Sequence, residues 1–318
     1  MRDFIDQQLF AHVPEMREFN KSLAGMISVP SATNTNPVER IKAARESISF
    51  FILETVAEAQ DRVIQGPAGD LPIRILIPPT VDAVYLDIHG GGWVMGSPVM
   101  DDASNWAIAN VANVAVVSVD YRLAPEHPFP AGPDDCESAA LWLLENAVAE
   151  FGSDRILVGG GSAGAHLAVE TLIRLRDRHK AIHRVIGANL MFGVYDLGMT
   201  PSQCNAGDRF PILRTSDLEF CYEMYLPGID IEARRNPKYS PLYADLSNLP
   251  PALFTVGTHD MLLDDSLFMA SRWEIAGNQT ELAVYPESPH GFPMFPTAMA
   301  RAANHRIEDF LRRIIGCE

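Results

Sequence analysis

The segment ILVGGGSAGAHLA, in the middle of the chain, constrains the fold more than any other part of the sequence. An apolar run, a burst of glycine and an amphipathic stretch predict a strand that turns sharply into a helix. Gly159, Gly161 and Gly164 have the G-x-G-x-x-G spacing of a dinucleotide-binding turn. Gly160, Ser162 and Gly164 have the G-x-S-x-G spacing of a turn that exposes a nucleophilic serine. The same strand–turn–helix segment is therefore compatible with dinucleotide binding and with nucleophilic catalysis by a serine.

Apolar, β-branched runs recur along the chain and mark the expected strands. They are RVIQG, LPIRILIP, AVYLDIHG, VAVVSVDY, RILVGGG, RVIGANLMF, PALFTVGT and ELAVYP. Helical patterns fall between the later runs, at residues 101–112, 133–150, 163–179, 264–277 and 297–315. Strands that first follow one another and then alternate with helices predict an α/β fold, with an open sheet that becomes parallel and is covered on both faces.

A further helix is predicted ahead of the first strand, from Asn36 to Gln60. Asn36 can cap it, Pro37 suits the first helical position, and Glu39 falls three residues after the cap. This pattern predicts a long helix in the N-terminal part of the chain.

Residues 196–237 interrupt the alternation with turn residues and one short amphipathic run. We expect this segment to be a cap insertion that joins N-terminal cap helices in residues 1–60. The α/β core then has two parts, residues 61–195 and 238–318.

The charge of the chain limits its partners. With 25 Lys and Arg against 41 Asp and Glu, the formal net charge is −16, which argues against nucleic acid and anionic membranes as partners. The N-terminus lacks a signal-peptide core, and no apolar stretch is long enough to cross a bilayer. The four cysteines show no C-x-x-C spacing, and no Cys/His cluster suggests a metal. We therefore expect a cytoplasmic protein with free thiols.

The dinucleotide alternative fails on its context. Such a turn needs an acid about 20 residues further on, at the end of the next strand. Here the next strand begins only at Arg184 and the first acid beyond it is Asp196, while Asp177 lies at the tail of the intervening helix. No lysine follows the glycines to bind phosphates, as a P-loop requires. The context favours the serine.

The serine needs an acid and then a histidine, each on a loop after a later strand. The strand PALFTVGT runs into Asp260, and the strand ELAVYP runs into His290. Asp264 and Asp265 compete with Asp260, but we expect them to cap and charge the first turn of the helix that follows. Ser162, Asp260 and His290 therefore have the chain order of a Ser-Asp-His triad.

The strand AVYLDIHG ends in the motif HGGGW, which can provide the anion hole that a serine hydrolase also needs. Its glycines allow two backbone N–H groups to point to one place, where an oxyanion can form. We expect His89 to pin this turn by hydrogen bonds. In the segment YRLAPEHPFP we expect Arg122, Glu126 and His127 to be buried polar partners, because unpaired burial is costly. His259, which precedes the acid, is not expected to face it.

The motifs HGGGW, DYRLAPEHPFPAGPDD, GGSAGAHLA, HDMLLDD and HGF resemble those of the hormone-sensitive-lipase-like branch of the α/β-hydrolases, the bacterial family IV carboxylesterases. The resemblance extends from Leu71 to the C-terminus. It implies an α/β-hydrolase fold with a mostly parallel eight-stranded sheet and a helical cap. It also implies that the protein hydrolyses short acyl esters without a cofactor. Carried over by position, it implies a catalytic triad of Ser162, Asp260 and His290 and oxyanion donors at Gly91, Gly92 and Ala163.

The sequence departs from the family pattern at two positions. The family usually has Asp or Thr before the serine and Gly three residues after it, where this chain has Gly161 and Ala165. Neither departure removes a catalytic group. The expected pocket-lining residues are Trp93, Tyr195, Phe210, Met261 and Phe292. Relatives often pair through the last strand, so a homodimer is expected from the resemblance.

These observations predict a serine carboxylesterase that acts on small, uncharged, short-chain acyl esters through an acyl-enzyme intermediate. A lactonase, an amidase or a deacetylase would use the same triad. A third hypothesis is a small-molecule receptor, because one fold can serve several functions and the site must decide between them.

Overall fold

The protein, described here from a computed structural model, contains one eight-stranded sheet that confirms the expected α/β-hydrolase architecture. The structure describes residues 5–26, 36–49, 55–210 and 212–316. The strand order is β1-β2-β4-β3-β5-β6-β7-β8; β2 runs antiparallel to both of its neighbours, and the remaining pairs are parallel. The strands are β1 (Gln60–Gly66), β2 (Gly69–Leu76), β3 (Ala83–Ile88), β4 (Val114–Val119), β5 (Ile156–Gly161), β6 (Val185–Met191), β7 (Ala252–His259) and β8 (Thr280–Pro289).

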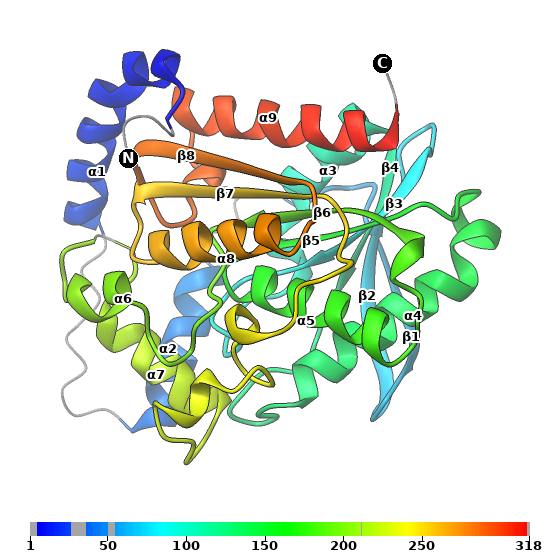
Figure 1. Cartoon of the computed structure of the whole chain (residues 1–318), viewed down its shortest axis with the longest axis horizontal. Coiled ribbons are helices and arrows are strands. Elements are labelled where there is room, and N and C mark those ends of the chain that lie inside the picture. Colours follow the sequence, from blue (N-terminus) through cyan, green and yellow to red (C-terminus); the bar gives the residue numbers. More distant parts are fainter. Residues whose placement is uncertain (1–4, 27–35, 50–54, 211, 317–318) are drawn as a thin grey trace.

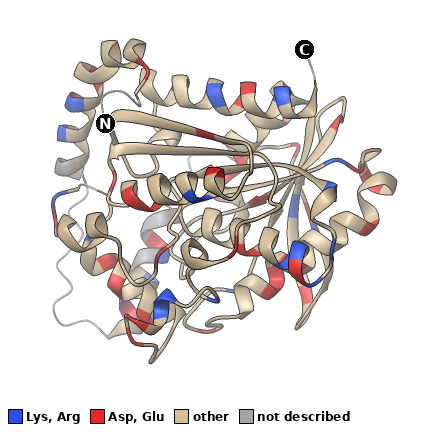
Figure 2. Cartoon of the chain, in the orientation of Figure 1, with Lys and Arg blue, Asp and Glu red and all other residues tan. Residues whose placement is uncertain are grey.

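Helices cover both faces of the sheet (Figure 1). One face is covered by α3 (Asp102–Ala112) and α9 (Ala298–Ile315), the other by α4 (Ala131–Phe151), α5 (Ala163–Asp177) and α8 (Leu263–Ile275). The central strands are apolar on both sides because both sides are packed: every residue of β3 and β4 is buried. Figure 2 shows acidic and basic residues interspersed on the surrounding helices and loops.

The N-terminal helices lie in two places. Helix α1 (Val13–Met26) contacts β8 and α9, where the Glu15 side chain accepts a hydrogen bond from the Ala298 amide. Helix α2 (Pro37–Ser49) instead lies near α7 (Thr215–Tyr225), which follows the short helix α6 (Pro201–Ala206). Arg40 joins α2 to α7 through an ion pair of 2.9 Å with Asp217.

The predicted N-terminal helix begins as expected but ends too late. Asn36 Oδ1 accepts a hydrogen bond from the Val38 amide at 3.1 Å, which confirms the cap. Helix α2 ends at Ser49, residues 50–54 lie outside the described part, and residues 55–59 are not helical. Gln60 pairs with Ile75 in the β1–β2 hairpin. Strand pairing thus begins at Gln60, and the predicted helix boundary at residue 60 was wrong.

In the described part of the chain, no helix is both long and apolar enough to span a membrane.

Candidate active site

Ser162 occupies the sharp bend between β5 and α5. Its backbone has φ +57° and ψ −121°, a strained conformation typical of a serine held clear of a strand-to-helix turn. Gly160 and Gly164 lie so close to β3 that a Cβ at either position would collide with the carbonyl oxygen of Ile88. The small flanking residues are thus required by the close approach of two backbones.

Three loops at the carboxyl ends of β5, β7 and β8 bring Ser162, Asp260 and His290 together. His290 Nε2 lies 3.0 Å from Ser162 Oγ, and His290 Nδ1 lies 2.8 Å from Asp260 Oδ2. The carboxylate can only accept, so Nδ1 carries the proton and Nε2 is free to accept from the serine hydroxyl. Asp260 is 2% exposed, and its second oxygen accepts from the Leu262 amide at 2.9 Å. All three predicted residues form one hydrogen-bonded chain.

The HGGGW loop lies beside this chain. Gly91 and Gly92 have φ of +114° and +60°, and their amides donate no hydrogen bond to the residues the structure describes. A Cβ on Gly92 would lie 2.7 Å from Cys221 Sγ of α7, so the insertion packs directly against this turn. Ala163 opens α5, and its amide has no acceptor within the helix. The loop and the helix start therefore offer free donors next to Ser162.

His89 pins the same loop, as expected. Its Nδ1 donates to the Gly90 carbonyl at 2.8 Å, and its ring stacks on Tyr121 with 4.2 Å between centroids. Tyr121 in turn donates its hydroxyl to the His89 carbonyl at 3.0 Å. Burial lowers the pKa of His89 to about 4, so the ring is neutral at physiological pH. These contacts give it a structural role.

The YRLAPEHPFP turn is only partly as predicted. Arg122 makes two 2.8 Å bonds to the buried Asp135 carboxylate, which confirms its predicted pairing, but Arg122 itself is only half-buried. Glu126 and His127 are exposed, so their expected burial was wrong. The turn projects toward α2, where Glu126 pairs with Arg45 at 2.8 Å.

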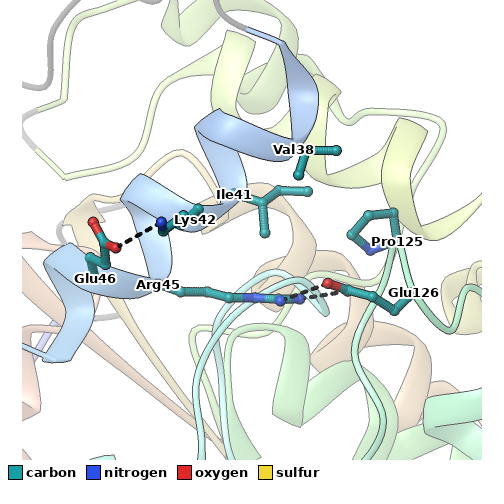
Figure 3. Close-up of a pocket in the computed structure, with 7 residues that line it drawn as sticks. All are labelled: Val38, Ile41, Lys42, Arg45, Glu46, Pro125 and Glu126. Atoms are coloured by element: carbon teal, nitrogen blue, oxygen red, sulfur yellow. Dashed lines mark hydrogen bonds and ion pairs between the residues drawn. The ribbon is translucent and has the colours of Figure 1, made fainter.

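Arg45 joins α2 to the HGGGW loop and to the YRLAPEHPFP turn, and Figure 3 shows its ion pair with Glu126. Its guanidinium donates to the Val94 carbonyl at 2.8 Å and to the Ala124 carbonyl at 3.1 Å, besides its two bonds to Glu126. Val94 follows the HGGGW motif directly. A cavity of about 660 Å³ opens beside this arginine and does not reach the triad; it is lined by Val38, Ile41, Lys42, Arg45, Glu46, Pro125 and Glu126.

His166 was not singled out from the sequence. It lies one helical turn after Ser162, where its Nδ1 accepts from Trp93 Nε1 at 3.2 Å and its Nε2 donates to the Tyr239 carbonyl at 2.8 Å. Burial lowers its pKa to about 4. It therefore links the HGGGW motif to the segment that follows the insertion. The available signal was a histidine among the small and apolar residues of GAHLA.

The structure places most of the expected pocket residues in the core. Trp93, Tyr195, Met261 and Phe292 are each at most 1% exposed. Phe292 packs on Tyr285 toward α9, on the other side of the sheet from the main core. Phe210 is half-buried, with its ring centroid 5.8 Å from that of His259. Of these five side chains, Phe210 alone keeps substantial access to solvent.

Asp264 and Asp265 lie in the first turn of α8, as expected, but neither side chain caps the helix, contrary to expectation. Asp265 is buried and accepts from the amides of Tyr195 and Asp196 at 2.7 and 2.9 Å, so it holds the loop after β6. Asp264 accepts from the Ser202 amide in the same segment. Burial raises the pKa of Asp265 to about 7. These carboxylates accept hydrogen bonds from the segment that follows β6, and the first turn of α8 is left without a side-chain cap.

Two further expectations concern the partner of His259 and the clustering of metal-binding side chains. His259 Nδ1 lies 3.4 Å from Glu287, which is consistent with its not being the partner of Asp260. Within the described ranges, no three His, Cys, Asp or Glu side chains gather as a metal site would require.

Comparisons with known proteins agree with this architecture. A family model described as alpha/beta hydrolase fold matches residues 85–294. The carboxylesterase NlhH of Mycobacterium tuberculosis is 38% identical over 248 residues, which are 74% of this chain and 75% of the relative. An ethyl acetate hydrolase of Pseudomonas putida is 35% identical over 233 residues, 70% of this chain and 71% of the relative.

Solved structures give the same result over nearly the whole chain. A hyperthermophilic esterase of the archaeon Pyrobaculum calidifontis has a TM-score of 0.83 and 30% identity, covering 95% of this chain and 98% of its own. A hormone-sensitive lipase from a metagenome library has a TM-score of 0.79 and 29% identity, covering 94% and 98%. The chain is therefore a carboxylic ester hydrolase and belongs to the hormone-sensitive-lipase-like branch of the α/β-hydrolases, the bacterial family IV carboxylesterases.

Proposed function

We propose that the protein hydrolyses esters through an acyl-enzyme on Ser162. His290 takes the serine proton as Ser162 Oγ attacks the ester carbonyl, and then returns a proton to the leaving alcohol. Asp260 holds the imidazole in the required tautomer and stabilises its cation. Water repeats the cycle on the acyl-enzyme and releases the acid. The observation that carries this proposal is the continuous chain of hydrogen bonds of 3.0 and 2.8 Å from Ser162 to Asp260.

The amides of Gly91, Gly92 and Ala163 are the proposed donors to the oxyanion. Supporting this, they lie beside Ser162 without competing acceptors in the described residues, and Ala163 lies at the positive end of α5. Removing one such donor typically costs about 3–4 kcal/mol of transition-state stabilisation. The anion hole would therefore contribute a substantial share of the catalysis.

We propose short, uncharged acyl esters as substrates. The relative from Pseudomonas putida carries the name ethyl acetate hydrolase, which supports a small acyl group. We also propose a cap formed by α2 with the 196–237 insertion, since Arg40 pairs with Asp217 and Cys221 packs on the HGGGW loop. Helix α1, although within residues 1–60, contacts β8 and α9 instead.

The test is turnover of p-nitrophenyl esters from acetate to palmitate by wild type and by Ser162→Ala. We expect the rate to fall steeply with chain length, and Ser162→Ala to lose at least about 1,000-fold in kcat. Ser104→Ala, at an exposed serine of α3, is the matched control and should keep full activity. An active Ser162→Ala would contradict the proposal. A wild type that binds the esters without cleaving them would instead favour the receptor hypothesis.

A further inference from the structure

The residue before the nucleophile is glycine, and its missing side chain leaves room for an aromatic ring. A Cβ on Gly161 would lie 2.9 Å from Cε2 and 3.0 Å from Cζ of Phe192. Cβ atoms essentially never approach other atoms so closely, so a side chain at residue 161 and this ring position exclude each other. The departure from the family pattern at Gly161 is thus coupled to Phe192, at the end of β6.

The ring of Phe192 lies against the proposed base. Its centroid is 4.9 Å from that of the His290 imidazole, at an interplanar angle of 74°. Aromatic pairs favour this edge-to-face arrangement. Phe192 therefore touches both the residue before Ser162 and the partner of Ser162.

The Phe192 ring is fixed in position by packing against the neighbouring strands β7 and β8. Phe192 is 6% exposed and packs in a cluster with Val256 of β7 and Val284 of β8. Its backbone has φ +37°, which is uncommon for a bulky residue, and its amide donates to the Thr255 carbonyl at 2.6 Å. A side chain restrained in this way can restrain its neighbour.

The second departure from the family pattern, Ala165, lies close to Gly193, the residue after Phe192. A Cβ on Gly193 would collide with the Tyr195 hydroxyl oxygen and would lie 2.9 Å from Cβ of Ala165, so Ala165 packs closely against residue 193. Both unusual residues around Ser162 therefore pack against the two residues that follow β6, Phe192 and Gly193.

We propose that Phe192 is a positioning residue for His290, and that Gly161 is glycine because any side chain there would displace this ring. The bond from Nδ1 to Asp260 fixes the direction of the imidazole but leaves it free to tilt about that axis. The Phe192 ring limits the tilt and so keeps Nε2 aligned with Ser162 Oγ. Small misplacements of reacting groups cost large factors in rate. This proposal rests on the proposed function of Ser162 and His290.

A double-mutant cycle tests the coupling. We expect Phe192→Ala to lower kcat for p-nitrophenyl acetate by about 10- to 100-fold with KM within about threefold, and Phe192→Leu to recover part of the loss. Gly161→Ala should lower kcat at least about fivefold in the wild-type background. In the Phe192→Ala background, where the ring is gone, it should change kcat less than about twofold.

Gly187→Ala is the matched control, because a Cβ there would also meet apolar side chains, those of Ile314 and Leu157, but away from the site. It should lower the melting temperature without lowering kcat. An equal loss from Gly161→Ala in both backgrounds, or an unchanged kcat in both Phe192→Leu and Phe192→Ala, would overturn the proposal. If Phe192→Ala does not fold, the comparison of Gly161→Ala in wild-type and Phe192→Leu backgrounds replaces it. Activity remaining in Ser162→Ala would instead refute the function on which the proposal rests.

Discussion

Glu170→Gln should have little effect on stability below about pH 5 and should stabilise the protein increasingly as the pH rises toward 8. Glu170 lies on α5, two turns after the serine, and its Oε2 is buried without a hydrogen-bond partner in the described residues. Burial raises its pKa to about 8, although the nearby Arg174 acts in the opposite direction. The folded protein therefore holds this side chain as the neutral acid where the unfolded chain has released its proton.

The sign and the size follow from the two pKa values. A carboxyl whose folded pKa is raised contributes stability that is fully present below its unfolded value of 4.5 and is lost as the pH rises through about 8. Each pH unit in this window is worth about 1.4 kcal/mol. Between pH 5 and pH 8, wild type should thus lose on the order of 4 kcal/mol of unfolding free energy that the Gln variant keeps. At about 2 °C per kcal/mol, this is a difference of roughly 8 °C in melting temperature.

The assay is thermal unfolding of wild type and Glu170→Gln at half-unit steps from pH 5 to pH 8.5. Other titrating groups contribute equally to both proteins, so the difference between the two curves isolates Glu170. Glu145→Gln, on the exposed side of α4, is the matched control and should follow wild type. Parallel curves for wild type and Glu170→Gln would refute the reasoning, because they would mean that Glu170 is ionised in the folded protein across this range.

Three other perturbations have definite expected outcomes. In ester turnover assays, Gly92→Ala should lower kcat by about 100-fold, because its Cβ would meet Cys221 Sγ at 2.7 Å and turn the amide away from the oxyanion. Adding Cys221→Ala to this variant should recover part of the lost kcat, and no recovery would contradict the steric explanation. Arg45→Lys should lower kcat/KM about fivefold, since lysine cannot reproduce the guanidinium bonds to Val94 and Glu126, and equal kinetics would contradict this role. The pKa of His166 is lowered to about 4, so its share of stability is lost as the pH falls from 6.5 toward 4. In urea unfolding between pH 7 and pH 4.5, His166→Gln should show a smaller loss than wild type.

The features that the sequence predicted well have local or periodic causes. The serine turn could be located because close packing of two backbones restricts Gly160 and Gly164 to glycine. Asp260 and His290 could be located because parallel strands bring their carboxyl ends to one edge, so any loop that follows a strand is near the site. The antiparallel start of the sheet and the helices on its two faces follow from the spacing of apolar runs.

What the sequence could not predict depends on contacts between distant segments. An apolar residue such as Phe292 is expected to be buried, but its type does not tell whether it faces the site or the far side of the sheet. Glu126 finds its partner in α2, and Asp265 finds its partners in the loop after β6; neither pairing leaves a pattern along the chain. The contact of Phe192 with His290 likewise joins residues almost 100 positions apart.

The most direct test of the account is to locate the residue that a fluorophosphonate modifies. The reagent reacts with a serine only where a neighbouring base activates it. The account predicts a single labelled peptide containing modified Ser162 in wild type, and labelling slowed at least about 100-fold in His290→Ala. Label on another serine, or an unchanged rate in His290→Ala, would contradict the claim that His290 activates Ser162.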